Sequence, residues 1–116
     1  MKKTSMELGG NAPFIVFDDA DIDAAIQGAM ISKYRNAGQT CVCSNRLFVQ
    51  DDVYDEFVAK LVKATQELTV GNGAEDGIII GPLVNAKAVT DVDKLVQDSI
   101  SAGAQLAAGG GPHDLG

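Results

Sequence analysis

The stretch PFIVFDDADIDAAIQGAM, residues 13–30, holds the local signals that decide the fold. Residues 14–17 are aromatic or β-branched and predict a buried strand. The acidic run that starts at Asp18 offers an N-cap and carboxylates for a first helical turn, so we expect a helix from about Asp21 to Asn36. A strand that leads directly into a helix is typical of an α/β protein.

The rest of the chain continues the alternation of strands and helices. The other predicted elements are strands at residues 4–8, 46–50 and 105–108 and helices at about residues 51–68 and 85–102. Gly103 stands where a helix commonly ends in a left-handed residue. This order predicts an α/β fold with parallel-type sheet strands and about three helices.

The composition and net charge of the chain exclude several classes of protein. The 116 residues, 46% of them hydrophobic, are enough for one globular domain with a single core. A net charge of -7 argues against binding to nucleic acid or to anionic membranes. The apolar runs are shorter than the roughly 20 residues of a membrane helix, and no signal peptide is expected. Two cysteines form no disulfide framework, so we expect a cytoplasmic protein in a reducing compartment.

Cys41 and Cys43, the only cysteines, stand side by side in NAGQTCVCSNRLFV, residues 36–49. Cys41 follows a helix end and is expected in a reachable loop, where a thiol can act as a nucleophile. The other interpretation is a small buried apolar side chain. Cys43 is a redox partner that forms a reversible disulfide with Cys41, or it packs under the loop. Together with His113 these thiols lack the spacing and the fourth ligand of a zinc site, so no metal is expected.

Two charged residues are further candidates for the site. Glu7 ends the predicted strand at residues 4–8, where partial burial would make a carboxylate a better base near neutral pH; otherwise it is a solvated strand-end acid. Gly9 and Gly10 would let a flat ligand or another backbone approach. Arg35 precedes the Cys41 loop and could hold a substrate carboxylate, or it is a solvated cation at the helix C-terminus.

The segments MELGGNAPFIVFDDADID and NAGQTCVCSNRLFV resemble two motifs of the aldehyde dehydrogenase superfamily, and their separation is also similar. The resemblance implies that Glu7 is the general base and Cys41 the nucleophile. The detail YRNAGQTCVC looks most like the NAD(P)-dependent succinate-semialdehyde dehydrogenases, which implies that Arg35 binds the distal carboxylate of the substrate. GPLVNAKAV and the GAQLAAGG region also resemble the catalytic domain of the family.

The family chemistry implied by this resemblance is oxidation of an aldehyde to a carboxylic acid. Cys41 would attack the aldehyde carbon to give a thiohemiacetal, hydride would pass to NAD or NADP, and water activated by Glu7 would hydrolyse the thioester. The Cys41 N–H would serve the oxyanion. Gly9 is the residue expected to contact the cofactor.

Family members are longer, so residues 1–116 are expected to be the N-terminal portion of a catalytic domain, without the dinucleotide-binding and oligomerisation parts. We therefore expect no bound cofactor and no dehydrogenase activity from this chain alone. Its expected partners are a small aldehyde such as succinate semialdehyde and, because neighbouring strands would be missing, further copies of itself. The alternative function is a non-enzymatic thiol redox or assembly module derived from such a domain.

Overall fold

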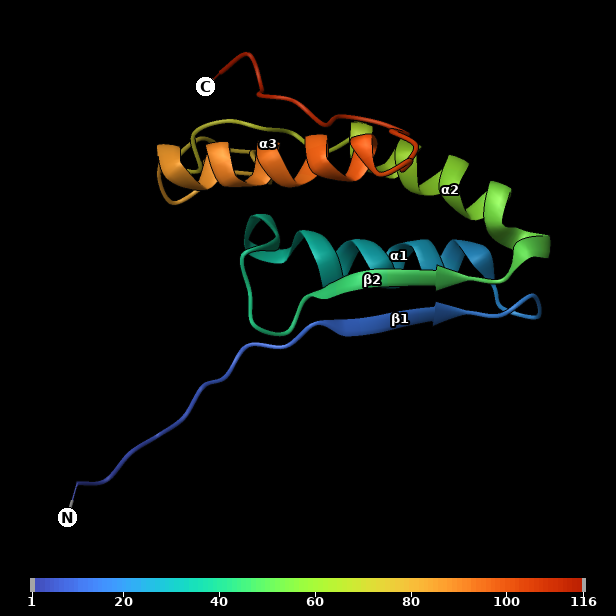
Figure 1. The fold of residues 1–116 in the computed structure, drawn as a ribbon, viewed down its shortest axis with the longest axis horizontal. Coiled ribbons are helices and arrows are strands. Elements are labelled where there is room, and N and C mark those ends of the chain that lie inside the picture. The colour runs from blue at the N-terminus through green and yellow to red at the C-terminus, as the bar shows by residue number, and fades with distance from the viewer. Residues whose placement is uncertain (1, 116) are drawn as a thin grey trace. The chain divides into compact units, whose positions relative to one another are not determined.

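The structure is a computed structural model that describes residues 2–115 and divides the chain into two compact units, with the boundary between Thr65 and Gln66. The first unit holds strand β1 (Ala12–Val16), helix α1 (Ile22–Tyr34), the short 3₁₀ segment η1 (Arg35–Gly38), strand β2 (Ser44–Val49) and all but the last residue of helix α2 (Asp51–Gln66). The second unit holds helix α3 (Ala86–Ser101). The predicted α/β fold, with parallel strands and three helices, is confirmed (Figure 1).

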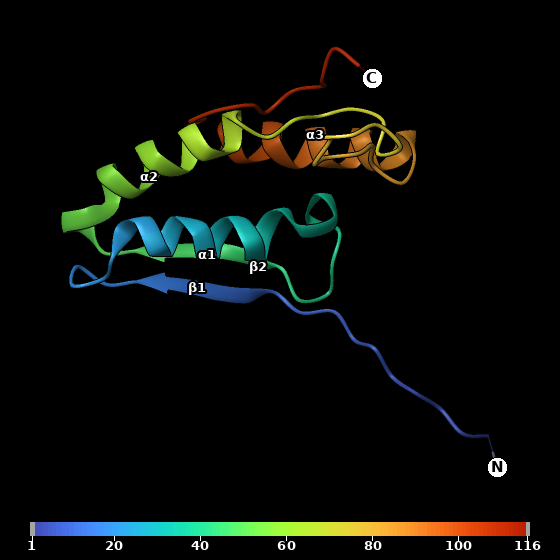
Figure 2. The ribbon, with the colours of Figure 1, turned by 180° about the vertical axis from the view of Figure 1, so that it is seen from behind.

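A β–α–β arrangement organises the first unit. β1 and β2 pair in parallel, with Phe14 beside Leu47 and Val16 beside Val49. Figures 1 and 2 show α1 lying along one face of these two strands. The core of the unit consists of Val16, Ile22, Ile26, Ala29 and Phe57, all buried, so side chains from β1, α1 and α2 meet in one apolar cluster.

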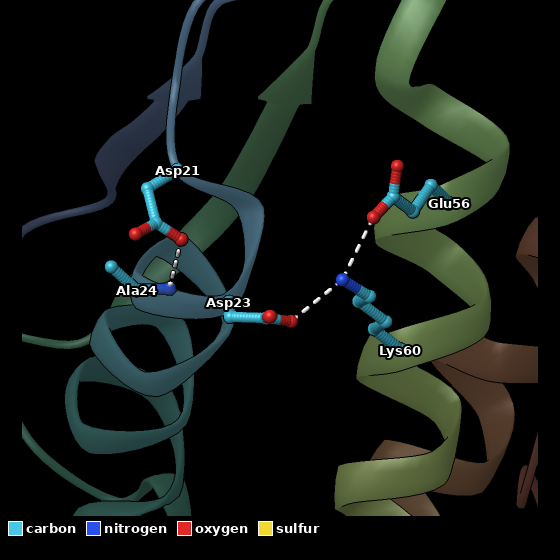
Figure 3. Close-up of polar contacts among 5 residues, drawn as sticks. All are labelled: Asp21, Asp23, Ala24, Glu56 and Lys60. Atoms are coloured by element: carbon cyan, nitrogen blue, oxygen red, sulfur yellow. Dashed lines mark hydrogen bonds and ion pairs between the residues drawn. The ribbon is translucent and has the colours of Figure 1, made fainter.

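The sequence explains both ends of α1. The Asp21 side chain accepts a hydrogen bond of 3.1 Å from the backbone N–H of Ala24, which is the predicted N-cap (Figure 3). The helix ends at Tyr34, two residues before the predicted end. Asn36 and Ala37 have φ of 51° and 55°, in the left-handed region, and the α-helical hydrogen-bond pattern cannot pass through them.

An ion-pair cluster joins α1 to α2. Lys60 Nζ lies 2.6 Å from an Asp23 carboxylate oxygen and 2.7 Å from a Glu56 carboxylate oxygen (Figure 3). The hydrogen bond to Asp23, with a second one to Glu56, raises the pKa of Lys60 above its ordinary value. Lys60 therefore stays charged at neutral pH. These exposed pairs orient the two helices and contribute little free energy of folding, because water screens them.

Helix α3 is capped at both ends, and the cap at its C-terminus was predicted. The Asn85 side chain accepts from the N–H of Ala88 at 2.9 Å. At the other end Gly103 has φ of 100°; its N–H donates to the Ile100 carbonyl, and the next N–H donates to the Ser99 carbonyl. This pair of bonds is a Schellman motif, so the prediction that Gly103 terminates the helix is confirmed.

Two predicted strands are wrong. Residues 4–8 and 105–108 have no regular secondary structure and are exposed apart from the half-buried Ala108. A strand is stabilised by backbone hydrogen bonds to a neighbour, and the described part of the chain pairs only β1 with β2 as named strands. Helix α2 also stops at Gln66, before the predicted Leu68. Within residues 2–115, no helix has the length and apolar content needed to cross a membrane.

Candidate active site

Cys41 occupies the tip of a tight turn between η1 and β2. The N–H of Cys43 donates to the Thr40 carbonyl at 3.4 Å, which places Cys41 and Val42 at the two central positions of the turn. Both central residues are exposed, and Cys41 is a free thiol. A small electrophile can therefore reach its sulfur from solvent.

Cys43 lies on the opposite side of the same turn, in the interior. It is 1% exposed and is a free thiol. Its Sγ lies 3.4 Å from the Gly38 carbonyl oxygen and 3.6 Å from the Lys33 carbonyl oxygen. Of the two interpretations of Cys43, packing under the loop describes this arrangement. A disulfide with Cys41 would require Cys43 to leave these contacts, and it stays a prediction.

Glu7 is not at the end of a buried strand. It is exposed within residues 2–10, an extended segment that runs from β1 away from the sheet (Figures 1 and 2). Of the two interpretations of Glu7, the solvated acid describes this position, since these residues have no neighbouring strand to cover them. The segment nevertheless starts beside the Cys41 turn: a Cβ added to Gly10 would lie 3.8 Å from the Cys41 carbonyl oxygen. Gly9 is exposed, with no atom within 4 Å of an added Cβ.

Arg35 is exposed and begins η1, directly after α1. Its place at the helix C-terminus suits a solvated cation that interacts with the helix dipole. The chain between Arg35 and the Cys41 turn is compact because the Asn36 side-chain amide donates to the Gln39 carbonyl at 3.1 Å. Arg35 and Cys41 therefore lie at the two ends of one short loop.

Arg46 is a residue of the site region that sequence reasoning missed. Its guanidinium donates two hydrogen bonds, of 2.7 and 3.2 Å, to the carbonyl of Asn11. These bonds coincide with a slip in the ladder, where Ala12 pairs with Ser44 but Pro13 pairs with Arg46. Proline has no N–H for the ladder, and a bulge of this kind is common beside such residues. An arginine two residues into a strand gave no signal for this contact.

The residue expected to contact the cofactor is Gly9. Gly9 lies in an open stretch of chain, and the sequence holds no phosphate-binding loop. Among residues 2–115 no group of three His, Cys, Asp or Glu side chains is placed to hold a metal ion. The reactive group that the arrangement presents to solvent is the exposed free thiol of Cys41.

Known proteins resemble the chain over its whole length. The sequence model described as "Aldehyde dehydrogenase family" matches residues 1–116. Glutarate-semialdehyde dehydrogenase of Pseudomonas aeruginosa is 63% identical over 116 residues, and succinate-semialdehyde dehydrogenase [NADP(+)] of Escherichia coli is 56% identical; both matches cover 100% of this chain and 24% of the relative. A crystal structure of succinate-semialdehyde dehydrogenase from Burkholderia pseudomallei superposes with a TM-score of 0.93 at 57% identity, over 97% of this chain and 23% of that one. The chain thus spans about a quarter of the length of these relatives.

Proposed function

The chain belongs to the aldehyde dehydrogenase family, and we propose that it supplies the catalytic segment of an NAD(P)-dependent enzyme that oxidises a small semialdehyde with a distal carboxylate. The observation that carries the proposal is the exposed free thiol of Cys41 at the tip of its turn. The names of the succinate- and glutarate-semialdehyde dehydrogenase relatives support the substrate class. The proposed compartment is the cytoplasm.

Each candidate residue receives one role in this proposal. Cys41 is the nucleophile, its backbone N–H is the donor assigned to the oxyanion, and Glu7 is the base that activates water. Arg35 is the cation for the distal carboxylate, because a guanidinium binds a carboxylate through two parallel hydrogen bonds. Gly9 is assigned to the cofactor side of the site. A nicotinamide cofactor would supply the hydride acceptor when bound.

The chemistry derived from this chain's own residues is therefore acyl transfer. With an activated ester, the Cys41 thiol first gives its proton to solvent, its sulfur forms a bond to the acyl carbon, the bond from that carbon to the leaving phenolate breaks, and the phenolate takes up a proton from solvent. Water then attacks the thioester and its proton passes to Glu7; the carbon–sulfur bond breaks, and Glu7 passes that proton to the departing sulfur to return the thiol. The net reaction is hydrolysis of the ester to a carboxylic acid and a phenol.

Replacement of Cys41 tests this proposal. We expect the chain to hydrolyse p-nitrophenyl acetate, and Cys41→Ala to lose at least about 90% of the rate above background, since removal of a nucleophile removes the covalent route. Glu7→Gln should leave the initial release of nitrophenol intact and slow the loss of the acetyl group, followed by intact mass. Reduction of NAD(P)+ with succinate semialdehyde should not exceed that of Cys41→Ala. Equal ester hydrolysis by the parent and Cys41→Ala would contradict the role of Cys41.

We also propose that a second copy of the chain packs on the uncovered face of the sheet. Ile15 and Phe48 pair directly across β1 and β2 and are 58% and 52% exposed. A parallel sheet is normally covered on both faces. Sedimentation velocity should show a concentration-dependent dimer, and Ile15→Lys should weaken it at least about tenfold by burying a charge. Ile79→Lys is the matched control, because Ile79 is also 58% exposed but lies outside the sheet. A monomer at all concentrations would contradict this proposal.

A further inference from the structure

The Cys41 turn is closed by side chains as well as by the backbone. Thr40 Oγ1 lies 2.8 Å from Cys43 Sγ, and this contact is additional to the backbone hydrogen bond between the same two residues. Thr40 is half-buried and Cys43 is buried, while the two residues between them are exposed. We call this contact between Thr40 and Cys43 the clasp of the turn.

The thiol of Cys43 has a single hydrogen, and the carbonyls of Gly38 and Lys33 are acceptors within reach of its sulfur. When the thiol donates to one of these carbonyls, the Thr40 hydroxyl donates to the sulfur; the contact between Thr40 and Cys43 also allows the reverse direction. In this arrangement Cys43 connects the turn to the last residues of α1 and to η1 at once.

The backbone at Gly38 is shaped to deliver its carbonyl to this sulfur. Gly38 has φ of 75°, and a Cβ there would lie 3.1 Å from the Lys33 carbonyl oxygen. A side chain at this position would therefore be strained and would press on a carbonyl that contacts Cys43. The buried Cys43 sulfur is therefore surrounded by the end of α1, by the left-handed residues of η1 and by Thr40.

We propose that Cys43, acting with Thr40, is a positioning residue that holds Cys41 at the tip of the turn for acyl transfer. The inference rests on the proposed role of Cys41 as nucleophile. Cys43 neither touches the substrate nor changes its covalent state in this role. The two carbonyl contacts of its sulfur, at 3.4 and 3.6 Å, are longer than ordinary hydroxyl hydrogen bonds, so a hydroxyl would reach these carbonyls less well.

Conservative variants of Thr40 and Cys43 separate positioning of the Cys41 thiol from its exposure. Thr40→Val removes the hydroxyl at nearly constant shape, Cys43→Val removes the thiol, and Cys43→Ser keeps a donor. We expect both valine variants to slow acylation of Cys41 by p-nitrophenyl acetate about tenfold, since small misplacements of a nucleophile cost rate steeply. Alkylation by iodoacetamide has looser geometric needs and should stay within about twofold. Cys43→Ser should recover acylation to within about threefold, because it restores one hydrogen bond.

The double variant Thr40→Val/Cys43→Val should acylate no more slowly than either single variant, because the two residues share one interaction. Acylation at the parental rate in Thr40→Val would overturn the clasp. So would a double variant slowed by the product of the single effects.

A second measurement keeps the clasp testable if the parent shows no acylation, a result that would defeat the proposed function instead. Hydrogen exchange of the Cys43 amide, which donates to Thr40, should be about tenfold faster in Thr40→Val than in the parent, since the turn opens more often. Thr90→Val is the matched control, because the Thr90 hydroxyl bonds only to its own helix, at the Ala86 carbonyl. Unchanged exchange at Cys43 in Thr40→Val would overturn the clasp independently of any activity.

Discussion

Iodoacetamide should modify Cys41 at least about 100-fold faster than Cys43 in the folded chain. Cys41 is exposed at the tip of its turn, whereas Cys43 is 1% exposed with its sulfur held among Thr40, Gly38 and Lys33. Modification of Cys43 must wait for local opening of this packed region, and an opening free energy of a few kcal/mol gives a factor of this size. The measurement is quenched labelling followed by mass spectrometry.

The design needs one precaution and one control. Trypsin cleaves after Arg35 and Arg46, so both thiols fall on the same peptide and the label must be assigned by fragmentation between them. In strong denaturant the two rates should agree within about threefold, because the protection is structural. Equal rates in the folded chain would show that Cys43 is not held in the interior. That result would favour the alternative function of a thiol redox module, in which both sulfurs must be reachable.

Phe57→Ala should abolish cooperative folding of the first unit near physiological temperature. Phe57 is 1% exposed and is the largest side chain of the core shared by β1, α1 and α2. Its truncation should cost about 3–5 kcal/mol through lost apolar burial and a cavity. A unit of this size has a free energy of unfolding of roughly 3–10 kcal/mol, so most of its stability would be lost.

The probe for this prediction must report on the first unit alone. Labelling of Cys43 as a function of urea does so, because its protection comes from residues of that unit. We expect Cys43 of Phe57→Ala to be labelled without urea or at a much lower midpoint than in the parent. Tyr54→Ala is on the same helix, but Tyr54 is 51% exposed. This variant should lower the free energy of unfolding by less than about 1 kcal/mol, so its urea midpoint should shift only slightly. Similar midpoints for the two variants would show that Phe57 is not a core residue.

Local signals predicted the parts of the fold that local chemistry determines. The acidic run that starts at Asp18 predicted an N-cap, which Asp21 supplies, and Gly103 was predicted to end a helix, which it does. The strand predicted at residues 4–8 failed because a strand also needs a neighbour. Ala37 shows a second limit of prediction from residue types. It adopts the left-handed conformation, which is rare for alanine and costs roughly 1–2 kcal/mol. The sequence therefore gave no indication that α1 ends before this residue.

The candidate site divides in the same way. The exposure of Cys41 follows from its place after a helix end, which the sequence indicates. The burial of Cys43 and its partners could not be predicted, because Lys33, Gly38 and Thr40 meet its sulfur only through the path of the loop. The contact from Arg46 to Asn11 is also set by the pairing of two distant segments. Residue types predicted the candidate chemistry, and tertiary structure determined which side chains support it.

The slipped ladder between β1 and β2 has a consequence for any change to either strand. β1 and β2 run in the same direction, so their N-terminal ends lie at the same end of the sheet. The segment that carries Glu7 leads into β1 there, and the turn that carries Cys41 leads into β2 there. Moving one strand by a single residue would displace the two segments by about 3.3 Å relative to each other and would turn every side chain to the other face. Pairing at Ala12 and Pro13 therefore sets the spacing between the proposed acid–base group and the proposed nucleophile. An insertion or deletion in either strand should be far more harmful than one in the glycine-rich chain after Ala102.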